Sequence, residues 1–166
     1  MESTKTRPRR SLIFTPGNKP QMYPKALKTG ADIVTIDLED AIAPQHKTEA
    51  RAATLALFQQ PTNDDGVERI VRINCLRTPE GLADLIAIIE TDSAPPALML
   101  PKVKSPDEIR VHEELLSGSH ANIRLHVIIE TNEGLESAHE IAHASERIDS
   151  ILFGGVDMAA ELRVEP

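Results

Sequence analysis

The segment 124–157, RLHVIIETNEGLESAHEIAHASERIDSILFGGVD, decides the fold expected for this chain. Its two apolar runs, 125–129 and 151–153, are each too short for a helix and are separated by about one helix of polar and small residues. This pattern is typical of a strand, helix, strand unit in a parallel sheet. Glu130 follows the first run and Asp157 follows the second, so both acids are expected at the same edge of the sheet. Two such carboxylates indicate a site for a hard divalent cation.

Strand-like runs recur along the whole chain and alternate with segments that begin as helices do. Proline stands at the first helical position expected for several of these segments, namely Pro44, Pro79 and Pro106. The strand-like runs are 10–15, 32–39, 69–74, 97–102, 124–130 and 150–155. Repeated alternation of strands and helices predicts an α/β protein with a parallel sheet.

Polar side chains gather toward the C-terminal ends of these runs. In the second run Val34, Ile36 and Leu38 share one face, whereas Asp37 and Glu39 share the other. Other polar residues at or just past strand ends are Asp40, Arg72, Asn74, Lys102, Glu130 and Asp157. Such an arrangement on successive strands is typical of the active site of a (β/α)8 TIM barrel, whereas an open doubly wound sheet usually has its site at one switch point. We therefore predict the barrel.

The chain is short for a complete barrel. A (β/α)8 barrel typically needs about 250 residues, whereas this chain has 166 residues. We therefore expect a TIM barrel truncated to about six β/α units, with residues 10–166 as a partial catalytic domain. Residues 1–9 are basic and polar, and we expect them to form a flexible tail.

Composition excludes several classes of partner. The formal net charge is −8, which argues against nucleic acid or an anionic membrane surface, because both need a basic face. No apolar stretch approaches the roughly 20 residues that span a bilayer. Cys75 is the single cysteine, which excludes an internal disulfide framework and fits a reducing compartment. We expect a cytoplasmic protein.

One competing motif suggests a different chemistry. His139 and His143 match the H-E-x-x-H pattern of zinc metalloproteases. On a helical wheel, however, Ala138, Ile141 and Ala142 form the buried arc and both histidines fall on the opposite side. A zinc site would need them to face a cleft with a third ligand, so we expect no zinc there.

Six motifs occur in an order and at spacings that together form a specific pattern. They are RSLIFTPG (10–17), DLEDAI (37–42), VRIN (71–74), LPK (100–102), IET (129–131) and FGGVD (153–157). They resemble the citrate lyase beta-subunit-like family within the HpcH/HpaI aldolase group, over about residues 9–163. The resemblance implies a Mg²⁺-dependent barrel enzyme that cleaves or forms a carbon–carbon bond, commonly between an acyl-CoA and a 2-oxo acid.

The resemblance also implies roles for single residues. Glu130 and Asp157 match the metal ligands, and Arg72 matches the arginine that holds the oxo acid. Asp37 and Glu39 match an acidic cluster near the metal, and we expect them to be catalytic together with Arg72. Substrate contacts are expected from Arg10, Arg72, Lys102, Gly154 and Gly155. Arg163 stands where many members of the family have glycine.

We therefore predict a lyase that needs Mg²⁺ and cleaves a hydroxyacyl-CoA of the citryl-CoA or malyl-CoA type. Retro-Claisen cleavage would yield an acyl-CoA and a 2-oxo acid. In the CoA-lyase members a neighbouring subunit supplies an acidic residue, so a homo-oligomer is expected. Two alternatives are a class II aldolase that releases pyruvate without CoA and a truncated, non-catalytic barrel fragment or assembly subunit.

Overall fold

The computed structural model describes residues 8–60 and 65–165. The strands are β1 (Leu12–Pro16), β2 (Ile33–Asp37), β3 (Glu68–Arg72), β4 (Ala97–Leu100), β5 (Arg124–Ile129) and β6 (Ile148–Phe153). The helices are α1 (Tyr23–Ala26), α2 (Lys47–Leu57), α3 (Pro79–Glu90), α4 (Pro106–Leu115), α5 (Asn132–Glu136), α6 (Ala138–Ala142) and α7 (Gly155–Leu162), with short 3-10 helices at Pro20–Met22 and Pro44–His46.

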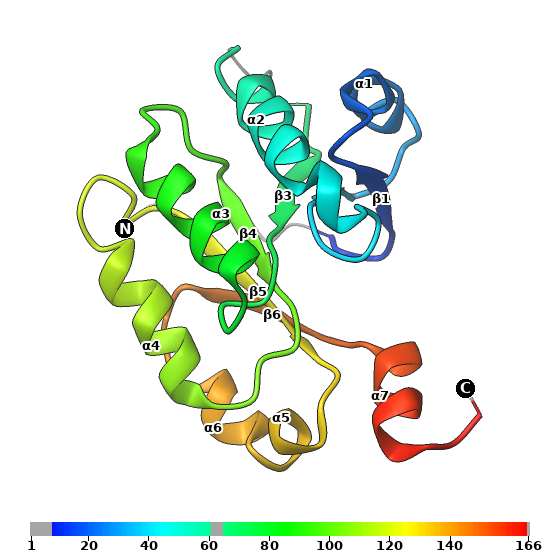
Figure 1. Ribbon diagram of the computed structural model, residues 1–166, viewed down its shortest axis with the longest axis vertical. Coiled ribbons are helices and arrows are strands. Elements are labelled where there is room, and N and C mark those ends of the chain that lie inside the picture. Colours follow the sequence, from blue (N-terminus) through cyan, green and yellow to red (C-terminus); the bar gives the residue numbers. More distant parts are fainter. Residues whose placement is uncertain (1–7, 61–64, 166) are drawn as a thin grey trace.

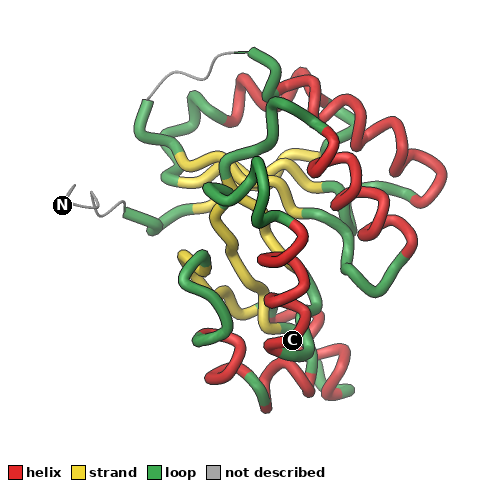
Figure 2. The backbone as a smooth tube through the Cα atoms, turned by 90° about the vertical axis from the view of Figure 1, so that its left-hand side faces the viewer, coloured by secondary structure: helices red, strands yellow, loops and turns green. Residues whose placement is uncertain are grey.

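All six strands pair in parallel and follow one another across the sheet in the order of the sequence. Within the described residues, β1 and β6 each pair on one side only. The helices from α2 to α6 lie along one side of the sheet, and α7 stands apart from α2, α3 and α4 (Figures 1 and 2). The predicted parallel α/β architecture is confirmed, and its six units form an open sheet.

The two faces of the sheet differ as the alternation of side chains predicted. The helix-covered face is aliphatic, with Val34, Ile36, Val71, Leu98, Leu125 and Val127 among its buried residues. The inner face carries a smaller apolar cluster of Ile33, Ile70, Ala97, Met99 and Ile128. Beyond this cluster, the face opposite the helix-covered one carries polar side chains at both ends of the strands. Those at the C-terminal ends form the candidate site.

The segment between β5 and β6 forms two short helices, α5 and α6, which meet at Ser137. Ile141 is fully buried, whereas His139 and His143 are exposed, with ring centroids 4.4 Å apart. Among the described residues no third His, Cys, Asp or Glu completes a metal-binding group with them. The outward direction predicted for both histidines is confirmed.

The N-terminal boundary differs from the prediction. Residues 1–7 of the expected tail lie outside the described residues. Arg9, which we placed in the tail, lies with Nε 2.7 Å from Oε2 of Glu68 and with Nη2 2.9 Å from Oδ2 of Asp149. Since these ion pairs join Arg9 to β3 and β6, Arg9 belongs to the folded unit.

The last helix ends in a conformation that favours glycine. Arg163 has a φ of 58°, and its N–H donates to the carbonyl group of Ala160 over 3.1 Å. A left-handed residue is the usual end of a helix, and a side chain there costs about 1 kcal/mol. The chain therefore keeps at Arg163 the backbone shape that a glycine would allow.

None of the helices in the described segments has both the length and the apolar character that a membrane crossing requires.

Candidate active site

Asp37 closes β2 and holds the loop that follows. Its Oδ1 accepts hydrogen bonds from the N–H of Glu39 (2.8 Å) and from Nε of Arg72 (2.8 Å). Its Oδ2 accepts from the N–H of Ala41 (3.0 Å) and from Nη2 of Arg72 (2.6 Å). Since only 2% of Asp37 is exposed and both of its oxygens are engaged, the geometry fits a positioning role better than the predicted catalytic one.

Arg72 ends β3 and pairs in register with Asp37. Its Nη1 lies 3.1 Å from Oε2 of Glu39 and 3.8 Å from Oδ2 of Asp40. The guanidinium also lies over the ring of Phe14, 4.9 Å from the centroid. Burial alone would lower the pKa of Arg72, but the neighbouring carboxylates, above all Asp37, raise it. The site therefore contains a fixed, oriented cation of the kind that binds carboxylates.

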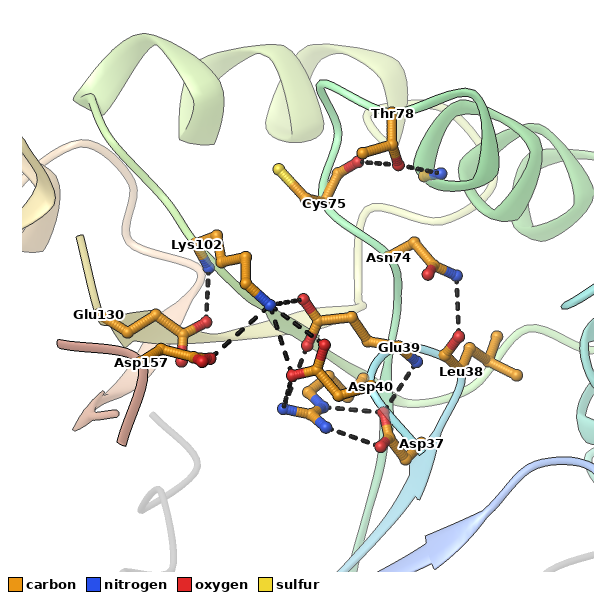
Figure 3. Close-up of polar contacts among 12 residues, drawn as sticks. Asp37, Leu38, Glu39, Asp40, Asn74, Cys75, Thr78, Lys102, Glu130 and Asp157 are labelled. Carbon is orange, nitrogen blue, oxygen red and sulfur yellow. Dashed lines mark hydrogen bonds and ion pairs between the residues drawn. The ribbon is translucent and has the colours of Figure 1, made fainter. Parts of the chain in front are cut away.

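Lys102 lies two residues past β4 and reaches acidic groups from other strand ends. Its Nζ is 2.5 Å from Oε1 of Glu39, 3.3 Å from Oδ1 of Asp40 and 3.7 Å from Oδ2 of Asp157 (Figure 3). Burial would lower the pKa of Lys102, but the hydrogen bond to Glu39 and the surrounding charges raise it. Lys102 therefore lies as a cation among three carboxylates.

The two expected metal ligands, Glu130 and Asp157, lie on the same side of the Lys102 ammonium group, opposite Glu39 and Asp40 (Figure 3). Glu130 follows β5, is 4% exposed, and accepts a hydrogen bond at Oε1 from the N–H of Lys102 (2.8 Å). Asp157 lies in the first turn of α7, with its side chain 39% exposed. Burial raises the pKa of the Glu130 carboxyl, and the charges of Glu39 and Asp157 raise it further. The structure thus brings Glu130, Asp157, Glu39 and Arg72 to one edge of the sheet.

The glycines after β6 have different surroundings. A methyl group at Gly154 would overlap Oε2 of Glu130 and would lie 2.7 Å from its Cβ. The N–H of Gly154 donates to the carbonyl group of Ile129 over 3.0 Å. Gly155 begins α7 and is exposed, with only ordinary contact to Phe153. Gly154 therefore makes room for the Glu130 carboxylate, a role that the predicted substrate contact did not include.

A hydrogen-bonded network behind the site fixes the loop after β2. Nζ of Lys47 donates to the carbonyl oxygens of Leu38 (2.8 Å) and Glu39 (2.6 Å) and to Oδ1 of Asn74 (2.6 Å). Nδ2 of Asn74 donates to the carbonyl group of Leu38 (3.0 Å) and to Oδ2 of Asp84 (2.7 Å). The strand-end position of Asn74 was visible in the sequence, but nothing in the spacing marked Lys47 or Asp84.

Arg10 lies at the opposite edge of the sheet. It precedes β1, and its Nη2 is 2.9 Å from Oδ1 of Asp32, which precedes β2. The side chain of Arg10 is 79% exposed. Since the N-terminal ends of parallel strands lie away from the edge that carries Glu130, the structure does not bring Arg10 together with the other predicted site residues.

One group of three acidic and histidine side chains in the described part of the chain has its ligand atoms within 4.8 Å of one another, namely Glu68, His126 and Asp149. It lies near the N-terminal ends of the strands, away from the predicted Mg²⁺ site. Arg9 pairs with both carboxylates, and Nη2 of Arg124 is 2.5 Å from Oδ1 of Asp149. Because two guanidinium groups already neutralise these acids, we assign the group to the stability of the fold.

The pH dependence of stability tests this assignment. Burial alone would raise the pKa of Glu68, but contacts from His126 and Arg9 outweigh it and lower the pKa to about 2. A depressed folded-state pKa contributes stability above the unfolded value near 4.5, and this contribution is lost as the pH falls toward 2. Urea denaturation should therefore show that Glu68→Gln costs about 1–3 kcal/mol at pH 7 and much less near pH 2. An equal cost at both pH values would contradict the role of this charge.

Residues 10–166 match the family model for HpcH/HpaI aldolase/citrate lyase. The chain belongs to the HpcH/HpaI aldolase/citrate lyase family. The resemblance stated from the sequence motifs is thus confirmed, and this family is one of enzymes.

Two relatives and one solved structure show how similar this chain is to other proteins and how much of each protein it covers. The chain is 35% identical to citrate lyase subunit beta of Escherichia coli over 99% of this chain and 56% of that protein. It is 32% identical to L-malyl-CoA/beta-methylmalyl-CoA lyase of Cereibacter sphaeroides over 96% of this chain and 52% of that protein. The citrate lyase beta subunit of Mycobacterium tuberculosis, complexed with oxaloacetate and magnesium, has a TM-score of 0.73 at 30% identity, over 95% of this chain and 65% of that chain. The chain thus spans about half the length of the curated relatives, and the TIM-barrel-like fold class is confirmed.

Proposed function

We propose that this chain carries the metal and oxo-acid part of the active site of a carbon–carbon lyase. The substrate would be a hydroxyacyl-CoA of the citryl-CoA or malyl-CoA type, and retro-Claisen cleavage would give an acyl-CoA and a 2-oxo acid. The observation that carries the proposal is the convergence of Glu39, Glu130 and Asp157 with Arg72 at the C-terminal ends of the strands. The names of the two relatives and the oxaloacetate in the M. tuberculosis complex support this substrate class.

The donor set fits Mg²⁺. Glu130 and Asp157 would hold the ion, since carboxylate oxygens are the ligands that Mg²⁺ prefers. Oε2 of Glu39 is buried and lies 3.1 Å from Nη1 of Arg72, and Oε1 lies 2.5 Å from Nζ of Lys102, so Glu39 adds a further carboxylate to this edge of the sheet. A bound Mg²⁺ would supply a Lewis acid that favours the ionised form of the substrate hydroxyl group.

The side chains of the chain itself would bind and orient the substrate. Arg72 would bind the carboxylate of the oxo-acid part, because its planar guanidinium is held in place by Asp37 and stays charged. Lys102 would contact an anionic oxygen of the substrate. Glu39 would act beside them, and the homo-oligomer expected from the resemblance would supply the acid or base. The cytoplasmic location expected from the single Cys75 stays a prediction.

A binding and turnover experiment tests the proposal. Citryl-CoA, malyl-CoA and the corresponding free hydroxy acids would each be added to the chain with and without Mg²⁺. We expect the CoA esters to raise the melting temperature only when Mg²⁺ is present and to release a 2-oxo acid. Pyruvate release from a free hydroxy acid would favour the class II aldolase instead. An absence of binding and turnover with every compound would favour the assembly subunit, and sedimentation would then give its oligomeric mass.

A further inference from the structure

The backbone of Lys102 is held in an unusual conformation. Its φ is 53°, a left-handed value that residues other than glycine and asparagine rarely adopt. Two hydrogen bonds hold the residue there. Its N–H donates to Oε1 of Glu130 over 2.8 Å, and its carbonyl group accepts from Nη2 of Arg77 over 2.7 Å. In this conformation the ammonium group of Lys102 reaches the carboxylates of Glu39, Asp40 and Asp157 (Figure 3).

The ammonium group of Lys102 has the surroundings of a bound cation. Its carboxylate neighbours come from two other segments, since Glu39 and Asp40 follow β2 and Asp157 lies in α7. The side chain is 32% exposed, so solvent screens these contacts only in part. Because the same residue also binds Glu130 through its backbone, Lys102 connects both proposed metal ligands to the acids after β2.

We infer that Lys102 is a built-in counter-cation, which holds the carboxylates of the site together in the absence of a divalent ion and must leave Asp157 when the ion binds. The inference rests on the proposed function, because it concerns the Mg²⁺ site formed by Glu130 and Asp157. A divalent cation among these oxygens would be repelled by a unit positive charge a few ångströms away. Lys102 therefore sets the metal affinity of the site, and its released ammonium group becomes available to an anionic oxygen of the substrate.

Calorimetric titration of the full chain with MgCl₂ tests the inference. Lys102→Asn removes the charge and keeps a residue that tolerates the left-handed backbone, so the bonds to Glu130 and Arg77 can remain. Lys102→Gly is the second variant, because glycine adopts this backbone without strain. We expect both variants to bind Mg²⁺ at least about tenfold more tightly than the wild type, since one repulsive charge has been removed. The matched control is Lys104→Asn, because the ammonium group of Lys104 pairs at the surface with Glu133 at 2.9 Å. The Mg²⁺ affinity of this control variant should equal that of the wild type.

The outcomes separate this inference from the proposed function. Unchanged or weaker Mg²⁺ binding in both Lys102 variants would overturn the inference, while loss of binding in Glu130→Gln would still uphold the metal site. Binding that occurs only in the Lys102 variants would support the inference. If neither the wild type nor any variant bound Mg²⁺, both ideas would fall. A purely structural role for Lys102 would lower the metal-free melting temperature without increasing the shift that Mg²⁺ produces.

Discussion

Glu130→Gln should weaken Mg²⁺ binding at least about a hundredfold and abolish Mg²⁺-dependent cleavage of the CoA ester. Loss of a group that only hydrogen-bonds a metal ligand already lowers metal affinity about 10–100-fold, and loss of a ligand should cost more. The amide has the shape of the carboxylate but no charge. Its oxygen can still accept the N–H of Lys102, so the loop after β4 should keep its conformation. The effect would therefore report the loss of a metal ligand and not a collapse of the site. Titration with MgCl₂ and an assay of 2-oxo acid release would measure both parts.

A matched control lies three residues along the chain. Glu133 is exposed in α5, and its carboxylate pairs with Lys104 at the surface. Glu133→Gln removes the same charge from the protein without touching the candidate site, so Mg²⁺ affinity should stay the same. If Glu130→Gln retained metal-dependent turnover at the level of this control, Glu130 would not be a ligand.

Gly81→Ala should destabilise the folded chain by about 3 kcal/mol or more. The added methyl group would overlap the carbonyl oxygen of Cys75 and would lie 2.8 Å from the carbonyl oxygen of Asn74. Both neighbours are backbone atoms, so neither can rotate away. The first turn of α3 is also fixed by Thr78, whose Oγ1 accepts the N–H of Gly81 over 3.0 Å.

The same change should reach the candidate site. Asp84 on α3 binds Asn74, and Asn74 binds Lys47, which holds the carbonyl groups of the loop after β2. A shift of the start of α3 would therefore disturb the hydrogen bond from Lys47 that holds the carbonyl group of Glu39. Urea denaturation would measure the loss of stability, and Gly118→Ala is the control, since a methyl group at Gly118 meets nothing within 4 Å. Equal stability of the two variants would show that α3 can move away from Cys75 at little cost.

The sequence predicted the features that depend on local order. Strand alternation has a period of two, so the aliphatic face of β2 and the acids at its end could be read directly from the chain. Glu130 and Asp157 were placed at one edge because each follows a strand of a parallel pair. Arg10 was assigned to the substrate by the resemblance alone, although the predicted run 10–15 already put it at the N-terminal end of a strand, away from the acids at the C-terminal ends. The strand begins at Leu12, and Arg10 lies ahead of it.

The features that depend on distant partners could not be predicted. The backbone of Lys102 is fixed by Glu130, which lies 28 residues away, and its ammonium group contacts Glu39, which lies 63 residues away. Lys47 likewise meets Asn74 over 27 residues. No periodicity or spacing encodes such pairs, because they arise only when the strand ends have been brought side by side.

The order of the strands has a consequence for how the chain is made. Because each described strand pairs only with the strands before and after it in the sequence, the sheet can grow by one β/α unit at a time. Each pairing therefore needs only the next β/α unit, although parallel pairing across a helix is slower than the closing of a hairpin. The pairing that sets Asp37 beside Arg72 therefore involves no residue of β5 or β6.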